Sequence, residues 1–319
     1  MTMNDNKAIH LEGGNFYDDL RINIAESHAK LDVSLPKTAK NLPQNKWWFS
    51  FFKKLEYFAT AIFQKAELLD GLCLIGWRRR WFKEFRNYWE ACLGGRPLRQ
   101  ADFYQLYHEY RKKQQCPNAL EWNTQEQHVR NWQSPNQFFS ILAYVRQQAV
   151  CPIVPMHVWK YVPANARILE YGCSLAPFYT CAREFSLCRN AHWTLADIPG
   201  FAFHYAKFCF MSDPNVDLVT ISDLNNPLPH EGPFEVIFLT TVLEHVADPC
   251  ALMKYILNKM SAGGILIFDY IKSEGTGLDT PSALAGRNAC IEFIRRNTRL
   301  LAGSLESEGN LPLTIVRIL

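Results

Sequence analysis

The spacing of hydrophobic residues changes near Pro155. From Lys46 to about Val150, apolar residues recur at steps of three and four, which is the spacing of one face of an amphipathic helix. Beyond Pro155, short apolar runs alternate with helix-like segments, and this alternation predicts βαβ units around a mostly parallel sheet. The expected strands are Arg167–Tyr171, His192–Ala196, Val216–Ser222, Phe234–Leu239, Ile265–Tyr270, Thr298–Gly303 and Leu313–Ile318.

Three regions follow from this pattern. Residues 1–40 are polar with few aromatics, so we expect a flexible arm. Residues 41–150 are interpreted as a helical, aromatic-rich lid or substrate-binding region. One of its helices is expected to begin at Ser134-Pro135-Asn136-Gln137, because serine caps helices and proline favours their first turn. Residues 151–319 form the α/β domain, where Ser261-Ala262-Gly263-Gly264 is expected to turn the chain before the fifth strand.

Composition and charge narrow the class of protein. Of the 319 residues, 48% are hydrophobic and 20% are charged, which is typical of a soluble folded protein. The net charge of +3 is too small to indicate a nucleic-acid partner. The ten cysteines include no Cys-x-x-Cys pair, so we expect free thiols in a reducing cytoplasm and no metal site.

The sequence predicts neither a signal peptide nor a membrane-spanning helix. A bilayer requires about 20 consecutive apolar residues, and the nearest stretch, Trp47–Trp77, is interrupted by charged side chains. The aromatic face of Trp47–Phe58, beside Arg78-Arg79-Arg80, leaves open a peripheral contact with a membrane. A folded helical region needs the same face, and the oligomeric state is not predicted.

The first two strands of the α/β domain end in residues that suit a nucleoside. Gly172-Cys173-Ser174-Leu175-Ala176 follows the first strand, and Asp197 ends the second. Open α/β sheets bind nucleosides at this edge, where a carboxylate accepts two hydrogen bonds from a ribose diol. Ser174 and Ala176 stand where a pyrophosphate site needs glycine, which disfavours dinucleotides. The alternatives are a plain strand-to-helix turn and an Asp197 that only caps a helix.

The later strand ends carry further polar groups. Asp223 closes the third strand, where it would meet an adenine edge, although a polar turn is the alternative. His245 follows the fourth strand and is the preferred general base because its reference pKa is about 6.5; the alternative is a structural histidine. Tyr270, at the end of the fifth strand with Asp269, is a weaker catalytic prediction, and its alternative is a core tyrosine with a satisfied hydroxyl.

Together these residues resemble a class I S-adenosylmethionine-dependent methyltransferase. Ile168–Cys173 is similar to the first motif of that superfamily, Asp197 to its ribose-binding acid, and Leu243-Glu244-His245-Val246 to a frequent signature after its fourth strand. Asn131-Trp132-Gln133 further resembles a poorly characterised bacterial branch. The resemblance implies a Rossmann-like seven-stranded, mostly parallel sheet of order 3-2-1-4-5-7-6, with the last strand antiparallel.

The resemblance also implies S-adenosyl-L-methionine as cofactor, and methyl transfer to an O or N atom of a small-molecule or glycan acceptor. Trp122 and Trp132 either line an acceptor pocket or fill the core. The alternative function is a catalytically inactive cofactor-binding scaffold or partner subunit, motivated by Ser174 and Ala176. His245 and Tyr270 are the predicted catalytic residues. The predicted cofactor-binding residues are Glu170, Gly172, Cys173, Ser174, Asp197, Ile198, Asp223, Leu224 and Thr240.

Overall fold

The computed structural model describes the C-terminal part of the chain most fully. The described residues are 81–92, 98, 102–103, 106–107, 125–133, 138, 141–145, 156–228, 231–272, 279–306 and 309–319. The expected arm over 1–40, the segment Trp47–Phe58, the helix start at 134–137 and Trp122 lie outside these residues.

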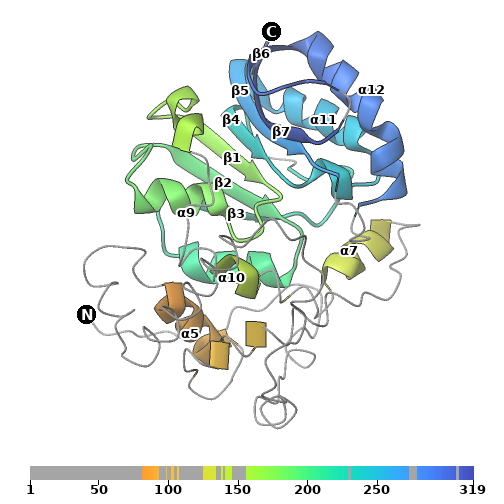
Figure 1. Cartoon of the computed structure of the whole chain (residues 1–319). Coiled ribbons are helices and arrows are strands. Elements are labelled where there is room, and N and C mark those ends of the chain that lie inside the picture. Colours follow the sequence, from red (N-terminus) through yellow and green to blue (C-terminus); the bar gives the residue numbers. More distant parts are fainter. Residues whose placement is uncertain are drawn as a thin grey trace, which may run out of the picture.

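Helices and strands alternate through the α/β domain (Figure 1). The strands are β1 (Arg167–Tyr171), β2 (His192–Asp197), β3 (Val216–Thr220), β4 (Phe234–Leu239), β5 (Met260–Tyr270), β6 (Thr298–Ala302) and β7 (Leu311–Ile318). The α-helices are α5 (Trp81–Cys92), α7 (Gln125–Gln133), α9 (Pro177–Glu184), α10 (Phe201–Phe210), α11 (Pro249–Asn258) and α12 (Pro281–Asn297). Two 3-10 helices are η2 (Met156–Tyr161) and η3 (Leu243–His245).

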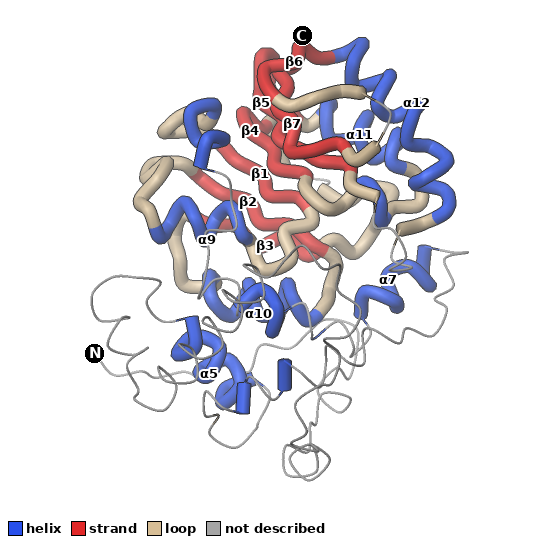
Figure 2. The backbone as a smooth tube through the Cα atoms, in the orientation of Figure 1, coloured by secondary structure: helices blue, strands red, loops and turns tan. Residues whose placement is uncertain are grey.

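The strands form one seven-stranded sheet in the order β3-β2-β1-β4-β5-β7-β6 (Figure 2). The strands from β1 to β5 pair in parallel, whereas β7 is antiparallel to both β5 and β6. The predicted fold class and strand order are therefore confirmed. Because Tyr171 pairs with Ala196 and Asp197 with Thr220, the carboxyl ends of β1, β2 and β3 meet at one edge.

The predicted turn before the fifth strand is wrong. Residues 261–264 lie within β5, which begins at Met260 and shifts register against β4 between Phe234 and Val236. Gly264 is required by a close approach, because a Cβ atom there would lie 2.9 Å from the Ser261 carbonyl oxygen. The glycines therefore mark an irregularity inside a strand. Glycine also favours turns, so the sequence alone does not distinguish the two structures.

Each face of the sheet is covered by its own layer of helices. One core cluster joins Phe178 of α9 and Phe203 of α10 to the sheet residues Trp193 and Phe238, whose rings stack at 5.9 Å between centroids and 6° between planes. The second core cluster joins α11 and α12 to the opposite face, and Figure 1 shows α12 and α9 on opposite sides of the sheet. This three-layer packing leaves the strand ends free to build a site.

The described part of the N-terminal region packs on α10 through aromatic side chains. Phe85 and Tyr88 of α5 contact Tyr205, with ring centroids 6.2 Å and 5.0 Å away. The Tyr88 hydroxyl also lies 2.8 Å from Nδ1 of buried His204. The two regions therefore share a third apolar cluster, which includes Leu175 and Phe201 of the α/β domain.

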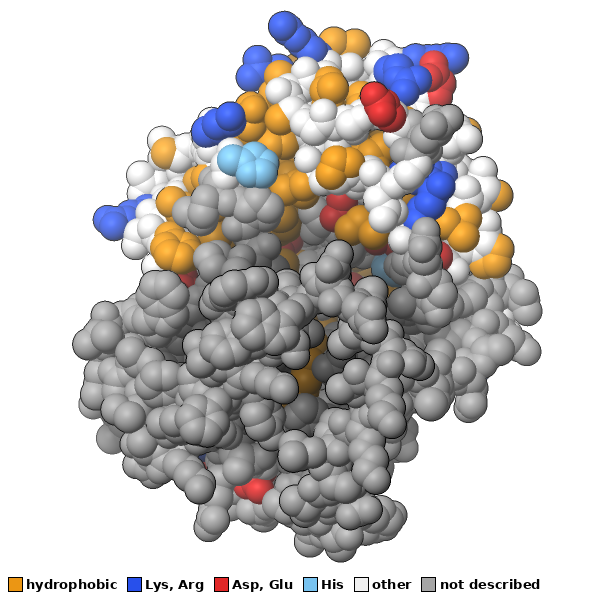
Figure 3. All heavy atoms as spheres, in the orientation of Figure 1, with side chains coloured by type: hydrophobic (Ala, Val, Ile, Leu, Met, Phe, Trp, Pro, Cys, Tyr) orange, Lys and Arg blue, Asp and Glu red, His pale blue; other side chains and the backbone are white. Residues whose placement is uncertain are grey.

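On the face shown in Figure 3, Lys and Arg side chains are scattered over the described surface.

None of the helices in the described part of the chain is long and apolar enough to cross a bilayer.

Candidate active site

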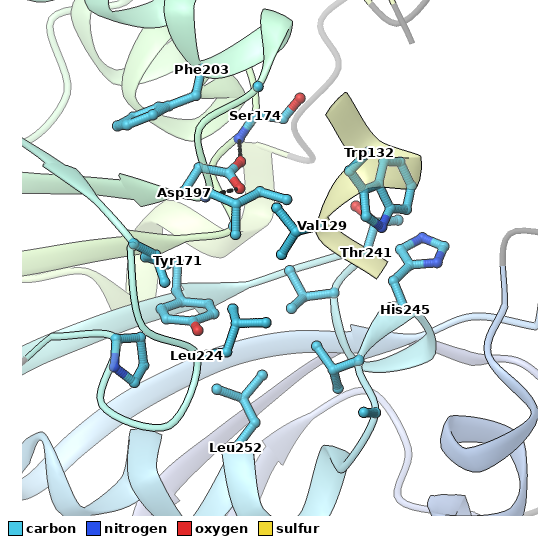
Figure 4. A pocket seen from close by; sticks show the side chains of 18 of the residues that line it. Val129, Trp132, Tyr171, Ser174, Asp197, Phe203, Leu224, Thr241, His245 and Leu252 are labelled. Atoms are coloured by element: carbon cyan, nitrogen blue, oxygen red, sulfur yellow. Dashed lines mark hydrogen bonds between the residues drawn. The ribbon is translucent and has the colours of Figure 1, made fainter. Parts of the chain in front are cut away.

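A cavity of about 680 Å³ opens at the carboxyl edge of the parallel strands (Figure 4). Its volume falls within the usual range of about 300–1,000 Å³ for small-molecule sites. Six of the residues predicted from sequence line it: Gly172, Ser174, Asp197, Ile198, Leu224 and His245. Glu170, Cys173, Asp223, Thr240 and Tyr270 are not among the residues that line it.

The loop after β1 adopts a left-handed conformation at three residues. Gly172 has φ +63°, and Ser174 and Ala176 both have φ +52°. Gly172 is further restricted by close packing, because a Cβ atom there would lie 2.4 Å from Cγ2 of Val242. Ser174 and Ala176 thus adopt a left-handed backbone conformation that glycine adopts at a lower conformational free-energy cost.

Asp197 joins the end of β2 to this loop. Its Oδ2 accepts a hydrogen bond of 2.6 Å from the Ser174 amide, and its Oδ1 accepts one of 2.7 Å from the Ile198 amide. Figure 4 shows both bonds beside the cavity. Burial raises the pKa of Asp197 to about 6. The carboxylate oxygens have about four lone-pair sites in total, so the two amides leave acceptor capacity for a ligand.

Glu170 performs a different task from the one predicted. It is buried, and its two carboxylate oxygens accept hydrogen bonds of 3.1 Å and 3.0 Å from the amides of Phe178 and Tyr179. These amides belong to the first turn of α9, whose N-cap residue, Ala176, offers no side-chain cap. Glu170 therefore supplies the missing cap from β1 and fixes the start of α9. Burial raises its pKa to about 8.

The turn after β3 contributes Leu224 and Asn225 to the cavity, but Asp223 does not line it. The exposed carboxylate of Asp223 accepts a hydrogen bond of 2.8 Å from the Asn225 amide. Tyr255 of α11 supports this segment, because its hydroxyl accepts a hydrogen bond of 2.9 Å from the Leu228 amide. Tyr255 also lines the cavity, and no motif in the sequence points to it.

The segment after β4 carries the polar groups of the opposite side. Thr241, rather than its predicted neighbour Thr240, lines the cavity. Thr241 has φ +52°, and its amide donates a hydrogen bond of 2.6 Å to Oδ1 of Asp269 at the end of β5. This left-handed residue redirects the chain, a conformation that the sequence does not reveal.

His245 lies on this side, next to a buried acid. Its Nε2 is 3.8 Å from Oε1 of Glu244, a residue that is only 1% exposed. Burial, followed by the nearby Asp269 and Asp279 charges, raises the pKa of Glu244 to about 8. The Glu244 carboxyl group therefore favours its neutral, protonated form, and His245 lies beside it.

Tyr270 does not fit the predicted catalytic role. It is fully buried, and its hydroxyl donates a hydrogen bond of 2.6 Å to the Ala283 carbonyl of α12. The side chain ties β5 to α12, as the core interpretation of this residue anticipates.

Trp132 of α7 reaches the cavity from the N-terminal region. Its ring lies 4.8 Å from the His245 ring between centroids, at an angle of 63°. The next residue, Gln133, donates a hydrogen bond of 2.7 Å to the Pro199 carbonyl, just after Asp197. Val129, one turn earlier on α7, lines the same cavity (Figure 4). Helix α7 thus contacts both sides of the site.

Among the described residues, no group of three His, Cys, Asp or Glu side chains is arranged to hold a metal ion.

A family model described as a methyltransferase domain matches residues 143–301. This chain carries a class I S-adenosylmethionine-dependent methyltransferase domain. The resemblance identified from its motifs is thereby confirmed. No curated protein matches the chain.

The methyltransferase domain also has distant likenesses among solved structures. The N-methyltransferase NodS from Bradyrhizobium japonicum WM9, in complex with S-adenosyl-L-homocysteine, is 14% identical, with 48% of this chain and 78% of NodS covered at a TM-score of 0.36. The pyocyanin biosynthetic protein PhzM is 10% identical, with 69% of this chain and 72% of PhzM covered at a TM-score of 0.42. The [4+2]-cyclase SpnF is 20% identical at a TM-score of 0.35; 44% of this chain is covered, and the chain spans about half of that protein (54%).

Proposed function

We propose that the methyltransferase domain transfers a methyl group from S-adenosylmethionine to an oxygen or nitrogen atom of a small-molecule or glycan acceptor. The observation that carries the proposal is a continuous cavity that extends from Asp197, at the end of β2, to His245, after β4. The same cavity is therefore lined by a carboxylate that suits ribose hydroxyls, Asp197, and by a histidine that can accept a proton, His245.

The residues on the Asp197 side fit an adenosyl group. The carboxylate faces the cavity with acceptor capacity left after its two amide bonds, which suits ribose hydroxyl donors. The apolar side chains of Ile198 and Leu224 would pack against the adenine ring. Gly172 has no Cβ atom, which lets the loop after β1 pack against Val242 at the cavity.

The residues on the other side support the chemistry. When bound, S-adenosylmethionine supplies an electrophilic methyl group on a positively charged sulfur. An acceptor atom held in this cavity would take that methyl group and would have to give up a proton. His245 accepts the proton that the acceptor loses. Trp132 and Val129 exclude water and hold the acceptor in line, which reduces the entropy lost in the reaction.

Isothermal titration of the full chain with S-adenosylhomocysteine tests this proposal. We expect a heat of binding for the unmodified protein, and Asp197→Ala should weaken affinity by about 10- to 100-fold, because a hydrogen bond to a charged group contributes about 1.5–3 kcal/mol. Asp217→Ala, which removes an exposed acid of β3 paired with His192, is the matched control and should bind as the unmodified chain does. The absence of any heat would contradict the proposal.

A second candidate is a cofactor-binding scaffold without turnover, and the side chains at Ser174 and Ala176 favour it. Radiolabelled S-adenosylmethionine would separate the two candidates. Binding without transfer of label to any member of a broad acceptor panel would favour the scaffold, whereas label on one acceptor would exclude it.

A further inference from the structure

The cavity changes in chemical character beyond the Asp197 side. The acceptor wall is the part formed by Val129, Trp132, Thr241, His245 and Val246. On the basis of the function proposed above, we propose that the acceptor wall binds a flat, uncharged aromatic molecule, whose hydroxyl or amino group receives the methyl group.

Trp132 provides the surface for an aromatic ring. Figure 4 shows Trp132, Val129, Thr241 and His245 on one side of the cavity, across from Tyr171 and Leu224. The Trp132 ring is held against His245 at 4.8 Å, and its helix is anchored through Gln133 to Pro199. A ligand ring in this position gains apolar burial and a favourable ring–ring contact. The same contact brings the ligand near the proton acceptor, His245.

The charges of the lining disfavour an anionic acceptor. Among the described residues that line the cavity there is no lysine or arginine, whereas Asp197 and Asp248 both line it. The first turn of α11 offers little compensation, because Oδ1 of Asp248 already accepts a hydrogen bond of 2.9 Å from the Ala251 amide. A carboxylate or phosphate on the acceptor would lose its hydration without gaining a cationic partner, which is unfavourable.

The small number of polar groups separates an aromatic acceptor from a glycan. On the acceptor wall, the polar side-chain groups are the Thr241 hydroxyl, the His245 imidazole and the indole N–H of Trp132. A sugar presents several hydroxyl groups, and each one that is buried without a hydrogen-bond partner weakens binding. An aromatic ring with one hydroxyl or amino group needs a single partner, and His245 supplies it.

Titration of the full chain, saturated with S-adenosylhomocysteine, tests the proposal with three probes of similar size. These probes are 2-naphthol, its anionic counterpart 2-naphthoate, and the neutral sugar glucose. We expect binding of 2-naphthol, affinity for 2-naphthoate at least about tenfold lower, and no binding of glucose. Equal affinity for the two naphthyl probes, or preferential binding of the sugar, would overturn the proposal.

Variants of Trp132 locate the binding. Trp132→Ala should weaken 2-naphthol binding by about tenfold, and Trp132→Phe by less than about threefold, because the smaller ring keeps most of the contact. Phe185→Ala, which removes an exposed ring beyond α9, is the control and should have no effect. All three variants should bind S-adenosylhomocysteine as the unmodified chain does. If Trp132→Ala lost S-adenosylhomocysteine binding, the acceptor wall would not be separate from the cofactor site, and the proposal would be overturned. If the unmodified chain did not bind S-adenosylhomocysteine, the proposed function itself would be overturned.

Discussion

Glu244 is a carboxylic acid buried beside the proposed base, and its Oε2 atom has no hydrogen-bond partner among the described residues. Glu170 is equally buried, but both of its oxygens accept amide hydrogen bonds. The pKa of each is raised to about 8, chiefly by burial. Both acids therefore take up a proton when the chain folds near neutral pH.

The free energy of unfolding should consequently fall as pH rises from 5 to 8. In this window the unfolded chain has released protons that the folded protein retains, so each such acid contributes a slope of at most about 1.4 kcal/mol per pH unit. Urea unfolding at several pH values measures the slope, and Glu244→Gln should reduce it. Glu184→Gln, an exposed position at the end of α9, should leave it unchanged. A Glu244→Gln slope equal to that of the unmodified chain would contradict the assignment.

Asp197 gives the cofactor site a pH dependence of its own. Its pKa is raised to about 6 by burial, and only the ionised form keeps all its acceptor sites for ribose hydroxyls. Affinity for S-adenosylhomocysteine should therefore be highest above pH 7 and fall as the pH decreases through 6. Calorimetric titrations at pH 5, 6, 7 and 8 would measure this, and the profile should flatten in Asp197→Asn. A profile that is flat in the unmodified chain would rule out this carboxylate as a ribose ligand.

At the scale of elements, two of the described helices begin at a proline that follows a capping residue. Asp248 caps α11 before Pro249, and Thr280 caps α12 before Pro281. The Thr280 hydroxyl accepts a hydrogen bond of 3.0 Å from the Ala283 amide and donates one of 2.9 Å to the Val246 carbonyl. Its own amide donates to the Glu244 carbonyl at 3.0 Å. One residue thus joins the start of α12 to the segment that carries His245.

Thr280→Ala should lower the free energy of unfolding by about 1–2 kcal/mol, because it removes a helix cap and leaves the half-buried Val246 carbonyl without this donor. Thermal and urea unfolding would measure the loss. Ser282→Ala is the matched control; its hydroxyl makes only a 3.4 Å contact to Thr280, and the change should cost less than about 0.5 kcal/mol. Equal stabilities for the two variants would mean that the cap contributes little.

The bounds of some helices and strands could be predicted from the sequence and those of others could not. The strands β1 and β4 have the predicted bounds because each is a buried apolar run next to a turn signal. The turn at Gly263-Gly264 could not be separated from an irregularity within β5, since glycine serves both. Strand order was implied only by the family resemblance, because local pattern carries no information on which strands are neighbours.

At the scale of the whole molecule, the sequence predicted the edge of the sheet that holds the site more reliably than the direction of individual side chains. Asp197 and His245 line the cavity, but Glu170 turns toward α9 and Tyr270 toward α12. Along a strand, neighbouring side chains point to opposite faces, so a shift of one residue changes the role. Residues such as Tyr255 are brought to the site by tertiary packing alone.

The aromatic cluster shared by α5 and α10 has a consequence for dissection of the protein. Leu175, in the loop after β1, and Phe201, at the start of α10, are buried in one apolar cluster with rings such as Phe85 and Phe138. A fragment confined to residues 156–319 would expose this apolar surface to water and should self-associate. Light scattering of that fragment beside the full chain would reveal it, and a monodisperse fragment would contradict the expectation. The apolar cluster therefore crosses residue 156, so a chain cut there would lose part of the packing around Leu175 and Phe201.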